Sequence, residues 1–341
     1  MISSDTSGKC LLHIFLLTFN REQSLRRTLA AIAASALKDH LLTIMDNCST
    51  DGTPRVCEEF RPILPRMEIR RHERNIGFGP NYYRSIESSV GEYTWILCDD
   101  DTLFPDRMAA LIDLIKTARP QACFVGGPRQ DMWPSGPGIS PADIQRRFHT
   151  FLTAQSFVPA LVFKTSLVGS AELVEGYFTV GTKFPQLAIG KKLLLEDVPC
   201  AVLHPPVLQR DPPAVMGLNP VELIDGWSEV CRTLPPALRR DAFYSIFVRP
   251  DAVGMINEVL SMIARMKIDG RIDPSYHLIR AGLNVGREPR LLLSLCRLAC
   301  IIPGGVYNFA RETYRKVKYG WLRKPLPPTF YARTEDDNLR R

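Results

Sequence analysis

Three consecutive aspartates, Asp99, Asp100 and Asp101, directly follow a short apolar segment, residues 93–97. Like charges raise one another's pKa and resist burial, so neighbouring carboxylates are costly to hold together without a counter-charge. A divalent cation resolves this conflict, because Mg²⁺ or Mn²⁺ binds carboxylate oxygens and keeps waters that phosphate oxygens can replace. The triplet therefore predicts a metal site. The structural alternative is an acidic cap of the helix that starts near Pro105.

Two other polar clusters also follow apolar segments. The first is Thr18, Phe19, Asn20 and Arg21 after residues 11–17, and the second is Asp46 with residues 47–53 after residues 41–45. In an open parallel sheet the ligand lies outside the carboxyl ends of the strands, so one crevice could collect these clusters and the aspartates. There, Asp46 could accept the ring N–H of a pyrimidine base. Residues 49–53 equally fit a turn and a helix start.

A glycine-containing segment, residues 75–81, lies between these clusters and the aspartates. It does not fit the dinucleotide-binding fingerprint, because no apolar strand directly precedes it and no third glycine follows at the required spacing. Gly77 and Gly79 indicate either a close approach of the backbone to a ligand or a tight turn before the helix that starts at Pro80.

The elements that must position these residues alternate between strands and helices. Short apolar runs predict strands at residues 11–17, 41–45, 67–71, 93–97, 122–125, 157–163 and 200–204. Helical spacing predicts helices at residues 22–36, 54–60, 80–89, 105–118 and 184–195. This alternation predicts an α/β fold with a mostly parallel sheet and helices on both faces. Residues 126–141, rich in Gly, Pro and Ser, are expected to form a mobile loop.

Composition limits the class of protein. The chain has 341 residues, of which 45% are hydrophobic and 23% charged, as expected for a folded soluble protein. Its nine cysteines form no C-x-x-C pair. They favour a reducing compartment over a zinc knuckle or a disulfide framework. Residues 1–9 are polar and lack the pattern of a signal peptide, so we expect a cytoplasmic protein.

Taken in order, these motifs resemble those of the family 2 glycosyltransferases, which have the GT-A fold. That family carries T-[YF]-N-R after one strand, an aspartate followed by S-T-D-G-T after another, then N-x-G-x-x-x-N, and then D-x-D. The corresponding positions here are residues 18–21, Asp46 with residues 49–53, residues 75–81 and residues 99–101. Four motifs in the same order over residues 11–104 make the resemblance specific.

The resemblance implies a metal-dependent, inverting transferase that uses a nucleotide sugar, with UDP or dTDP favoured as the nucleotide. The implied donor-binding residues are Thr18, Phe19, Asn20, Arg21, Asp46, Asn75, Gly77, Asn81, Asp99, Asp100 and Arg210. The implied ligands of Mn²⁺ or Mg²⁺ are Asp101, Asp99 and His204.

The chain departs from the family pattern at the catalytic base. Family members carry a Glu-Asp pair at the start of the helix before the last strand, and residues 181–186 at that place contain no acid. Glu175 in the preceding segment is the expected base, with Glu172 as the alternative, whereas Glu196 precedes the last strand at the opposite edge of the sheet. Over residues 157–210 the chain resembles family members that build bacterial surface polysaccharides, including abequosyltransferase-like proteins. The implied acceptor is a glycan or a lipid-linked oligosaccharide.

The pattern becomes purely helical beyond Pro220. We expect a GT-A catalytic domain over residues 1–215, a helical region over residues 216–325 and a polar tail over residues 326–341. Residues 280–341 contain thirteen Lys or Arg against five Asp or Glu. Residues 291–302 are apolar but shorter than the roughly twenty residues that span a bilayer.

Cations and aromatic residues then alternate as far as Lys324, a mixture typical of contact with lipid headgroups. We therefore expect residues 291–324 to bind an anionic membrane peripherally, on its cytoplasmic face. A buried core helix at residues 291–302 is the alternative. No nucleic-acid partner is expected, and the sequence indicates no oligomeric state.

Two other functions are compatible with parts of this pattern. A nucleotidyltransferase also holds a nucleotide and a metal over such a sheet, but it would need a Gly-rich, basic phosphate loop where this chain has residues 18–21. A non-catalytic glycan-binding or scaffold protein would account for the missing Glu-Asp pair.

Overall fold

The computed structural model describes residues 10–126, 135–139, 143, 157–182, 184–196, 198–209 and 220–245, and the single residues 301, 303, 305, 306, 309 and 313. Arg210 lies outside the described residues, as does almost all of the segment 291–324. The predictions made for Arg210, for the membrane-binding segment and for the polar tail therefore have no structural counterpart here.

An eight-stranded sheet forms the centre of the described part of the chain. Its strands, in the order β3-β2-β1-β4-β8-β6-β9-β7, are Met67–Arg71, Leu41–Asp46, Leu12–Thr18, Tyr93–Cys98, Leu161–Lys164, Ala122–Phe124, Cys200–Val202 and Gly136–Ile139. Strands β3, β2, β1 and β4 are mutually parallel, β6 is parallel to β9, and β8 and β7 run antiparallel to their neighbours. The predicted mostly parallel sheet is confirmed.

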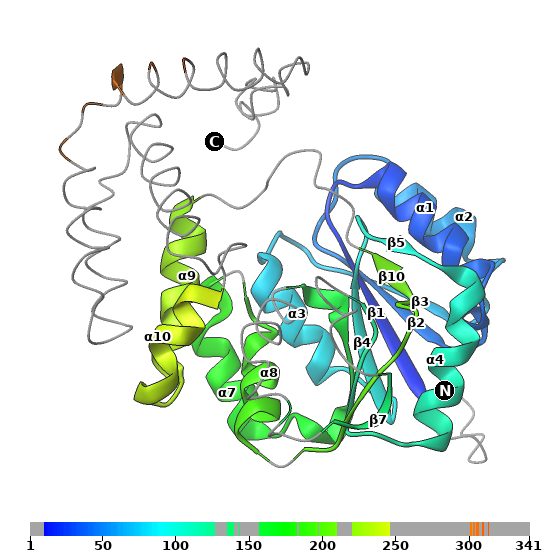
Figure 1. Ribbon diagram of the computed structural model, residues 1–341. Coiled ribbons are helices and arrows are strands. Elements are labelled where there is room, and N and C mark those ends of the chain that lie inside the picture. Colours follow the sequence, from blue (N-terminus) through cyan, green and yellow to red (C-terminus); the bar gives the residue numbers. More distant parts are fainter. Residues whose placement is uncertain are drawn as a thin grey trace.

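Helices cover both faces of this sheet (Figure 1). One face carries α1 (Glu22–Ala33), α2 (Thr53–Phe60) and α4 (Met108–Thr117), and the other carries α3 (Phe78–Glu87), α7 (Ser170–Phe178) and α8 (Leu187–Leu195). Beyond α8 lie α9 (Pro220–Thr233) and α10 (Pro236–Ser245). Short 3₁₀ turns occupy Ala36–Asp39, Pro105–Arg107, Val158–Ala160, Thr165–Leu167 and Val180–Thr182.

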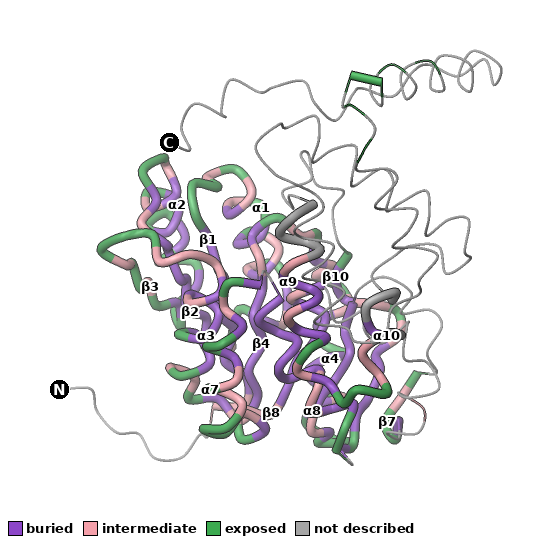
Figure 2. The backbone as a smooth tube through the Cα atoms, turned by 90° about the vertical axis from the view of Figure 1, so that its left-hand side faces the viewer, coloured by how far each residue is buried: buried purple, intermediate pink, exposed green. Residues whose placement is uncertain are grey.

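Strand β1 shows how the sequence builds two cores. All seven of its residues are buried, and successive side chains of a strand point to opposite faces. Phe15 and Leu17 join the hydrophobic cluster under α3 and α8, whereas Ile14 and Leu16 join the cluster under α1 and α4. Figure 2 shows the central strands as continuously buried, with exposed residues on the outer faces of the helices. An apolar run without alternation is therefore what this central strand requires.

The structure differs from the sequence-based expectation in the second half of the sheet. Gly136–Ile139, expected to lie in a loop, form strand β7 at the sheet edge, where Pro137 is tolerated because an edge strand has an unpaired side. The expected strand at residues 157–163 begins with the turn Val158–Ala160, and only Leu161–Lys164 is strand. Helix α7 was not predicted, because its outward apolar residues blur the helical spacing.

The first helices after Pro220 join the core of the sheet domain. The ring of Trp227 in α9 lies 5.0 Å from that of Phe184, edge to face. The indole Nε1 of Trp227 donates to the carbonyl of Ala242 in α10 at 2.9 Å. Helix α9 therefore shares a hydrophobic cluster with α8. The division of the chain at residue 215 stays a prediction.

Candidate active site

The carboxyl ends of β1, β2 and β4 meet at one edge of the sheet. Thr18 pairs in register with Asp46, and Leu17 pairs with Cys98, so Asp99 follows β4 directly beside Thr18. The Thr18 hydroxyl donates to Oδ2 of Asp99 at 2.5 Å. The structure thus brings together the first three predicted clusters, as parallel pairing of these strands requires.

Asp99 is a buried carboxyl group, with 5% of its surface exposed. Burial raises its pKa to about 7, and the charge of Asp100 acts in the same direction. The hydroxyl of Thr18 and the charge of Arg21 oppose this rise, since both favour the ionised form. Near neutral pH, Asp99 is therefore partly a carboxylate, which only accepts hydrogen bonds, and partly a protonated acid, which can donate a hydrogen bond to a sugar hydroxyl.

Asp100 and Asp101 offer a site for a divalent cation. Within the described residues, one oxygen from each carboxylate and the Sγ of Cys98 all lie within 4.8 Å of one another. Burial raises the pKa of Cys98 well above its ordinary value, so its sulfur is a neutral thiol. The anionic donors are then carboxylate oxygens, which fit a hard ion such as Mg²⁺ or Mn²⁺. Arg21 lies 3.4 Å from Asp100 on the exposed side.

The other two predicted ligands, Asp99 and His204, do not belong to this group of three residues. The Oδ2 of Asp99 accepts from Thr18. His204 follows β9, which is parallel to β6, and therefore lies at the carboxyl edge of the sheet. A small antiparallel pair, β5 (Thr102–Leu103) with β10 (Leu208–Gln209), joins the chain after the aspartates to the chain after His204. Ligation by Asp99 and His204 stays a prediction.

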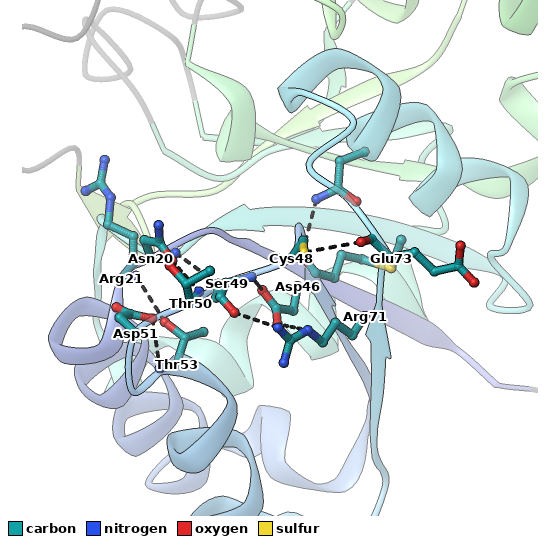
Figure 3. A network of polar contacts seen from close by, with 12 residues as sticks. Asn20, Arg21, Asp46, Cys48, Ser49, Thr50, Asp51, Thr53, Arg71 and Glu73 are labelled. Atoms are coloured by element: carbon teal, nitrogen blue, oxygen red, sulfur yellow. Dashed lines mark hydrogen bonds and ion pairs between the residues drawn. The ribbon is translucent and has the colours of Figure 1, made fainter. Parts of the chain in front are cut away.

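The turns after β1 and β2 are cross-linked by hydrogen bonds (Figure 3). The backbone N–H of Asn20 donates to Oγ of Ser49 at 2.9 Å, and the N–H of Thr50 donates to Oδ1 of Asn20 at 2.7 Å. Asn20 and Cys48 have φ angles of 52° and 70°, in the left-handed region that residues other than glycine seldom adopt. Two such residues, one in each turn at this edge, are typical of a ligand site.

Asp51 and Thr53 have a structural role. The carboxylate of Asp51 accepts the N–H groups of Thr53 at 3.0 Å and Glu22 at 3.1 Å, at the starts of α2 and α1. The hydroxyl of Thr53 accepts from the N–H of Arg21 at 3.0 Å. These bonds satisfy helix N-termini, so the turn-and-helix interpretation holds for these two residues.

Asp46 is fully buried, and its two oxygens differ. Oδ1 accepts the N–H of Ser49 at 2.9 Å. Oδ2 is also buried, yet no donor among the described residues lies within hydrogen-bond distance of it. Arg71 forms an ion pair with Asp46, with its Nε 3.6 Å from Oδ2, and its guanidinium also donates to the carbonyl of Ser49 at 2.7 Å. A buried acceptor without a donor fits the N–H of a bound base.

The segment 75–81 connects to the same edge. Gly77, with φ 86°, precedes α3, and Asn75 Oδ1 accepts its N–H at 2.8 Å. Asn81 is buried, with its Nδ2 donating to the carbonyl of Met45 at 3.2 Å and its Oδ1 2.9 Å from Nε2 of His72. Asn81 therefore holds α3 onto β2. The geometry favours a supporting role for it over direct donor contact.

Glu175 and Glu172 are both engaged in ion pairs across α7 and α8. Glu175 pairs with Lys191, and Glu172 pairs with Lys192 at 2.7 Å. Glu172 also accepts the N–H of Gly169 at 2.7 Å at the start of α7. Glu196 precedes β9 and so lies at the amino edge of the sheet, as expected.

Residues 181–186 lie just before α8, where the resemblance places the family's acidic pair. Tyr83 of α3 donates to the carbonyl of Pro185 at 2.5 Å. A Cβ on Gly226 of α9 would stand 2.1 Å from the carbonyl oxygen of Thr182, so only glycine allows this approach. The segment is therefore held between α3 and α9.

Sequence reasoning gave no role of their own to three residues of this edge. Cys98, directly before the aspartates, lies among the possible metal ligands, and Arg71 lies beside Asp46. Asn47 is buried beneath the segment 75–77. Cys98 adjoins the aspartates and Asn47 lies in the cluster after Asp46, whereas Arg71 stands at the end of a predicted strand and gave no separate signal.

Comparison with known proteins shows which family the residues at this edge of the sheet are similar to. Residues 13–158 match the family model described as "Glycosyl transferase family 2". We call these residues the family 2 domain, after the family that they match. The match covers β1 to β4 with all four sequence motifs. The likeness noted in the sequence is thereby confirmed.

Among curated proteins, the family 2 domain is similar to abequosyltransferase RfbV of Salmonella typhimurium, with 34% identity over 101 residues. That alignment covers 28% of this chain and 29% of RfbV, so the chain matches less than a third of that relative's length.

Solved structures share the fold over much more of the chain. S. aureus TarS 1–349 in complex with UDP aligns with a TM-score of 0.56 and 16% identity, over 90% of this chain and 92% of TarS 1–349. Mannosyltransferase PcManGT from Pyrobaculum calidifontis, in complex with GDP-Man and Mn²⁺, aligns with a TM-score of 0.50 and 15% identity over 89% and 88% of the two chains. The family 2 domain thus has the GT-A fold predicted for it.

Proposed function

We propose that this chain transfers a sugar from a nucleoside-diphosphate donor, UDP or dTDP favoured, to a glycan or lipid-linked acceptor in surface polysaccharide synthesis, with Mn²⁺ or Mg²⁺ and inversion of the anomeric centre. One observation carries the proposal. At a single sheet edge, Asp46 has a buried oxygen with no hydrogen-bond donor among the described residues, Thr18 bonds Asp99, and Asp100 and Asp101 lie close enough to share a cation.

In this proposal the nucleoside lies over the ends of β1 and β2. Oδ2 of Asp46 accepts the ring N–H of uracil or thymine, which supports the preference for a pyrimidine nucleotide. Phe19, with 40% of its surface exposed, offers an aromatic face at the same turn. Arg21, Asn20 and the segment 75–77 border the remaining donor space, and Asp99 and Asp100 bind the ribose and the sugar.

The acidic residues hold the diphosphate through the cation. Asp101 and Asp100 would provide carboxylate oxygens as ligands of the cation, and Asp99 and His204 are the further ligands proposed from the sequence. A bound divalent ion would neutralise the charge that develops on the leaving nucleoside diphosphate. PcManGT, whose structure contains GDP-Man and Mn²⁺, supports this use of a metal.

The reaction is a single displacement. The acceptor oxygen forms a bond to the anomeric carbon from the face opposite the diphosphate, the bond from that carbon to the phosphate oxygen breaks, and the acceptor proton passes to a carboxylate. Glu175 is the proposed base. For this role it must exchange its ion pair with Lys191 for the acceptor hydroxyl.

A thermal-shift screen tests the donor proposal. UDP, dTDP, GDP and their sugars are each added with and without Mn²⁺, because a ligand that binds only the folded state raises the melting temperature by mass action. We expect Mn²⁺-dependent stabilisation by UDP or dTDP that exceeds that by GDP. Stabilisation by none of the nucleotides would refute nucleotide-sugar use, whereas binding without transfer or hydrolysis would favour a non-catalytic relative.

The acceptor proposal includes peripheral binding of residues 291–324 to an anionic membrane. None of the described helices has both the length and the apolar character that crossing a bilayer needs. Ile301, Val306 and Phe309 expose 77%, 55% and 75% of their surfaces, so the apolar side chains of these three described residues of the segment are exposed. Each nearby cation adds about 1 kcal/mol at an anionic surface.

Sedimentation with vesicles tests this contact. The full chain should pellet with phosphatidylserine-containing vesicles at low salt and should be released as salt screens the attraction. A chain truncated after Pro289 is the control. Equal pelleting of the two proteins, or no pelleting of the full chain, would refute membrane binding by this segment.

A further inference from the structure

Asn47 is a buried polar residue that links the two sides of the proposed donor crevice. It exposes 5% of its surface. Its backbone N–H donates to the carbonyl of Thr18 at 3.0 Å, so its position is fixed at the end of β1. Thr18 is the residue that bonds Asp99, and Asn47 itself follows Asp46.

The side chain of Asn47 reaches from this point to the segment 75–77. Its Oδ1 accepts the N–H of Ile76 at 2.9 Å, and its Nδ2 donates to Oδ1 of Asn75 at 2.8 Å. The same oxygen of Asn75 accepts the N–H of Gly77 at 2.8 Å. Three hydrogen bonds therefore converge on a turn that contains a left-handed glycine.

This geometry requires an amide at residue 47. The amide of Asn47 supplies the acceptor for Ile76 and the donor for Asn75 from two different atoms. Aspartate would keep the acceptor and would place a second acceptor against Oδ1 of Asn75. Alanine would leave the N–H of Ile76 without its partner.

We propose that Asn47 is a positioning residue for the nucleotide donor, holding the segment 75–77 in its binding conformation before the donor arrives. This inference rests on the proposed donor site. Asn47 acts through the segment, not by touching the nucleotide. Without it the segment samples other conformations, and the affinity for the donor falls in proportion to the fraction of molecules that remain competent to bind.

The test compares Asn47→Ala with a control that weakens the same pair of strands elsewhere. Thr43→Val removes the buried hydrogen bond between Thr43 and His13, 2.8 Å long, which also joins β1 to β2 but lies away from the crevice. Both variants should lower the melting temperature. The two readouts are the Kd for UDP with Mn²⁺ and the amide hydrogen exchange of Ile76 and Gly77 in the ligand-free protein.

We expect Asn47→Ala to weaken UDP binding roughly tenfold and to accelerate exchange at Ile76, with kcat at saturating donor nearly unchanged. Thr43→Val should change neither readout. Asn47→Asp should give the same direction of change and replaces the alanine variant if that variant does not fold.

Three results would overturn the inference. If Asn47→Ala bound UDP as tightly as wild type does, the segment 75–77 would not need Asn47 to hold its conformation. Weaker affinity with unchanged exchange at Ile76 would mean that Asn47 contacts the nucleotide itself. Equal losses of UDP affinity in Asn47→Ala and Thr43→Val would mean that Asn47 contributes only to the general stability of the fold. If wild type binds no nucleotide, the proposed function fails, while the exchange readout still decides whether Asn47 holds the segment.

Discussion

Replacing Thr18 with valine removes one hydroxyl from the centre of the proposed site and leaves the shape of the side chain nearly unchanged. That hydroxyl donates to Oδ2 of Asp99 at 2.5 Å. Thr18 and Asp99 expose only 4% and 5% of their surfaces, so water cannot easily replace the lost donor. A hydrogen bond to a charged group contributes about 1.5–3 kcal/mol. The ionised form of Asp99 should lose stabilisation of that size.

This loss of stabilisation of ionised Asp99 should lower the activity of the enzyme. Because the Thr18 hydroxyl lowers the pKa of Asp99, its removal moves that pKa above the value of about 7 and leaves fewer molecules with an ionised Asp99 at neutral pH. We expect Mn²⁺-dependent release of nucleoside diphosphate at pH 7 to fall roughly ten- to a hundredfold, the factor that corresponds to 1.5–3 kcal/mol.

Thr28→Val is the matched control. The hydroxyl of Thr28 is equally buried and donates to the backbone carbonyl of Asp99 at 3.1 Å, so its removal disturbs the same residue without touching the carboxylate. Its melting temperature should fall while turnover stays within a few-fold of wild type. Equal turnover in the two variants would refute the role assigned to the bond between Thr18 and Asp99.

Three further predictions follow from other residues. Asp46→Asn should weaken UDP binding measured by calorimetry more than it weakens GDP binding, and equal losses would contradict pyrimidine recognition. Glu175→Gln should lower kcat far more than donor affinity, whereas the same pattern in Glu172→Gln instead would move the base to Glu172. Burial lowers the pKa of His13 from 6.5 to about 4, with Arg70 adding to the effect. Because the folded-state pKa is depressed, about 3 kcal/mol of stability present above pH 6.5 should be lost as pH falls towards 4. The free energy of unfolding of His13→Gln, measured with urea, should not show this loss at low pH. The same pH dependence in wild type and His13→Gln would refute the prediction.

The neutral state of His13 also follows from its contacts. Nδ1 accepts the N–H of Val90 at 3.2 Å, so the proton of the neutral ring lies on Nε2, 2.8 Å from the hydroxyl of Thr43. Protonation of Nδ1 would break the bond to Val90. This arrangement gives the physical reason for the acid sensitivity predicted for this part of the sheet.

The first half of the fold was predictable because each strand carries its own signal. The uninterrupted apolar run of β1 fits burial on both faces, and the polar residues that follow mark the carboxyl edge. Parallel pairing then requires Thr18, Asp46 and Asp99 to meet. Local sequence and strand topology together place these three residues without any knowledge of long-range contacts.

The second half depends on contacts that the sequence does not encode locally. Strand β7 consists of Gly136–Ile139 and exists through its pairing with β9. The approach of α9 to Thr182 depends on the missing side chain of Gly226. The partners of Glu175 and Glu172 come from α8, sixteen and twenty residues further along the chain. Neither the strand nor these ion pairs could be inferred from spacing alone.

The same limit applies within the site. The sequence marked Asp99 and Asp101 as metal ligands, whereas the structure groups Asp100 and Asp101 with Cys98 and directs Asp99 towards Thr18. Which of three adjacent side chains turns towards a neighbouring strand depends on the backbone after β4. Residue order alone does not contain that information.

Metal-dependent nucleotide binding by Asp101→Ala tests the central claim most directly. Wild-type protein and the variant are titrated with UDP in the presence and absence of Mn²⁺, and release of nucleoside diphosphate from the matching sugar donor is followed in parallel. We predict that wild type binds UDP more tightly with Mn²⁺, and that Asp101→Ala keeps its fold by circular dichroism but loses both the Mn²⁺ dependence and turnover. Near-normal turnover of Asp101→Ala with Mn²⁺ present would contradict the account.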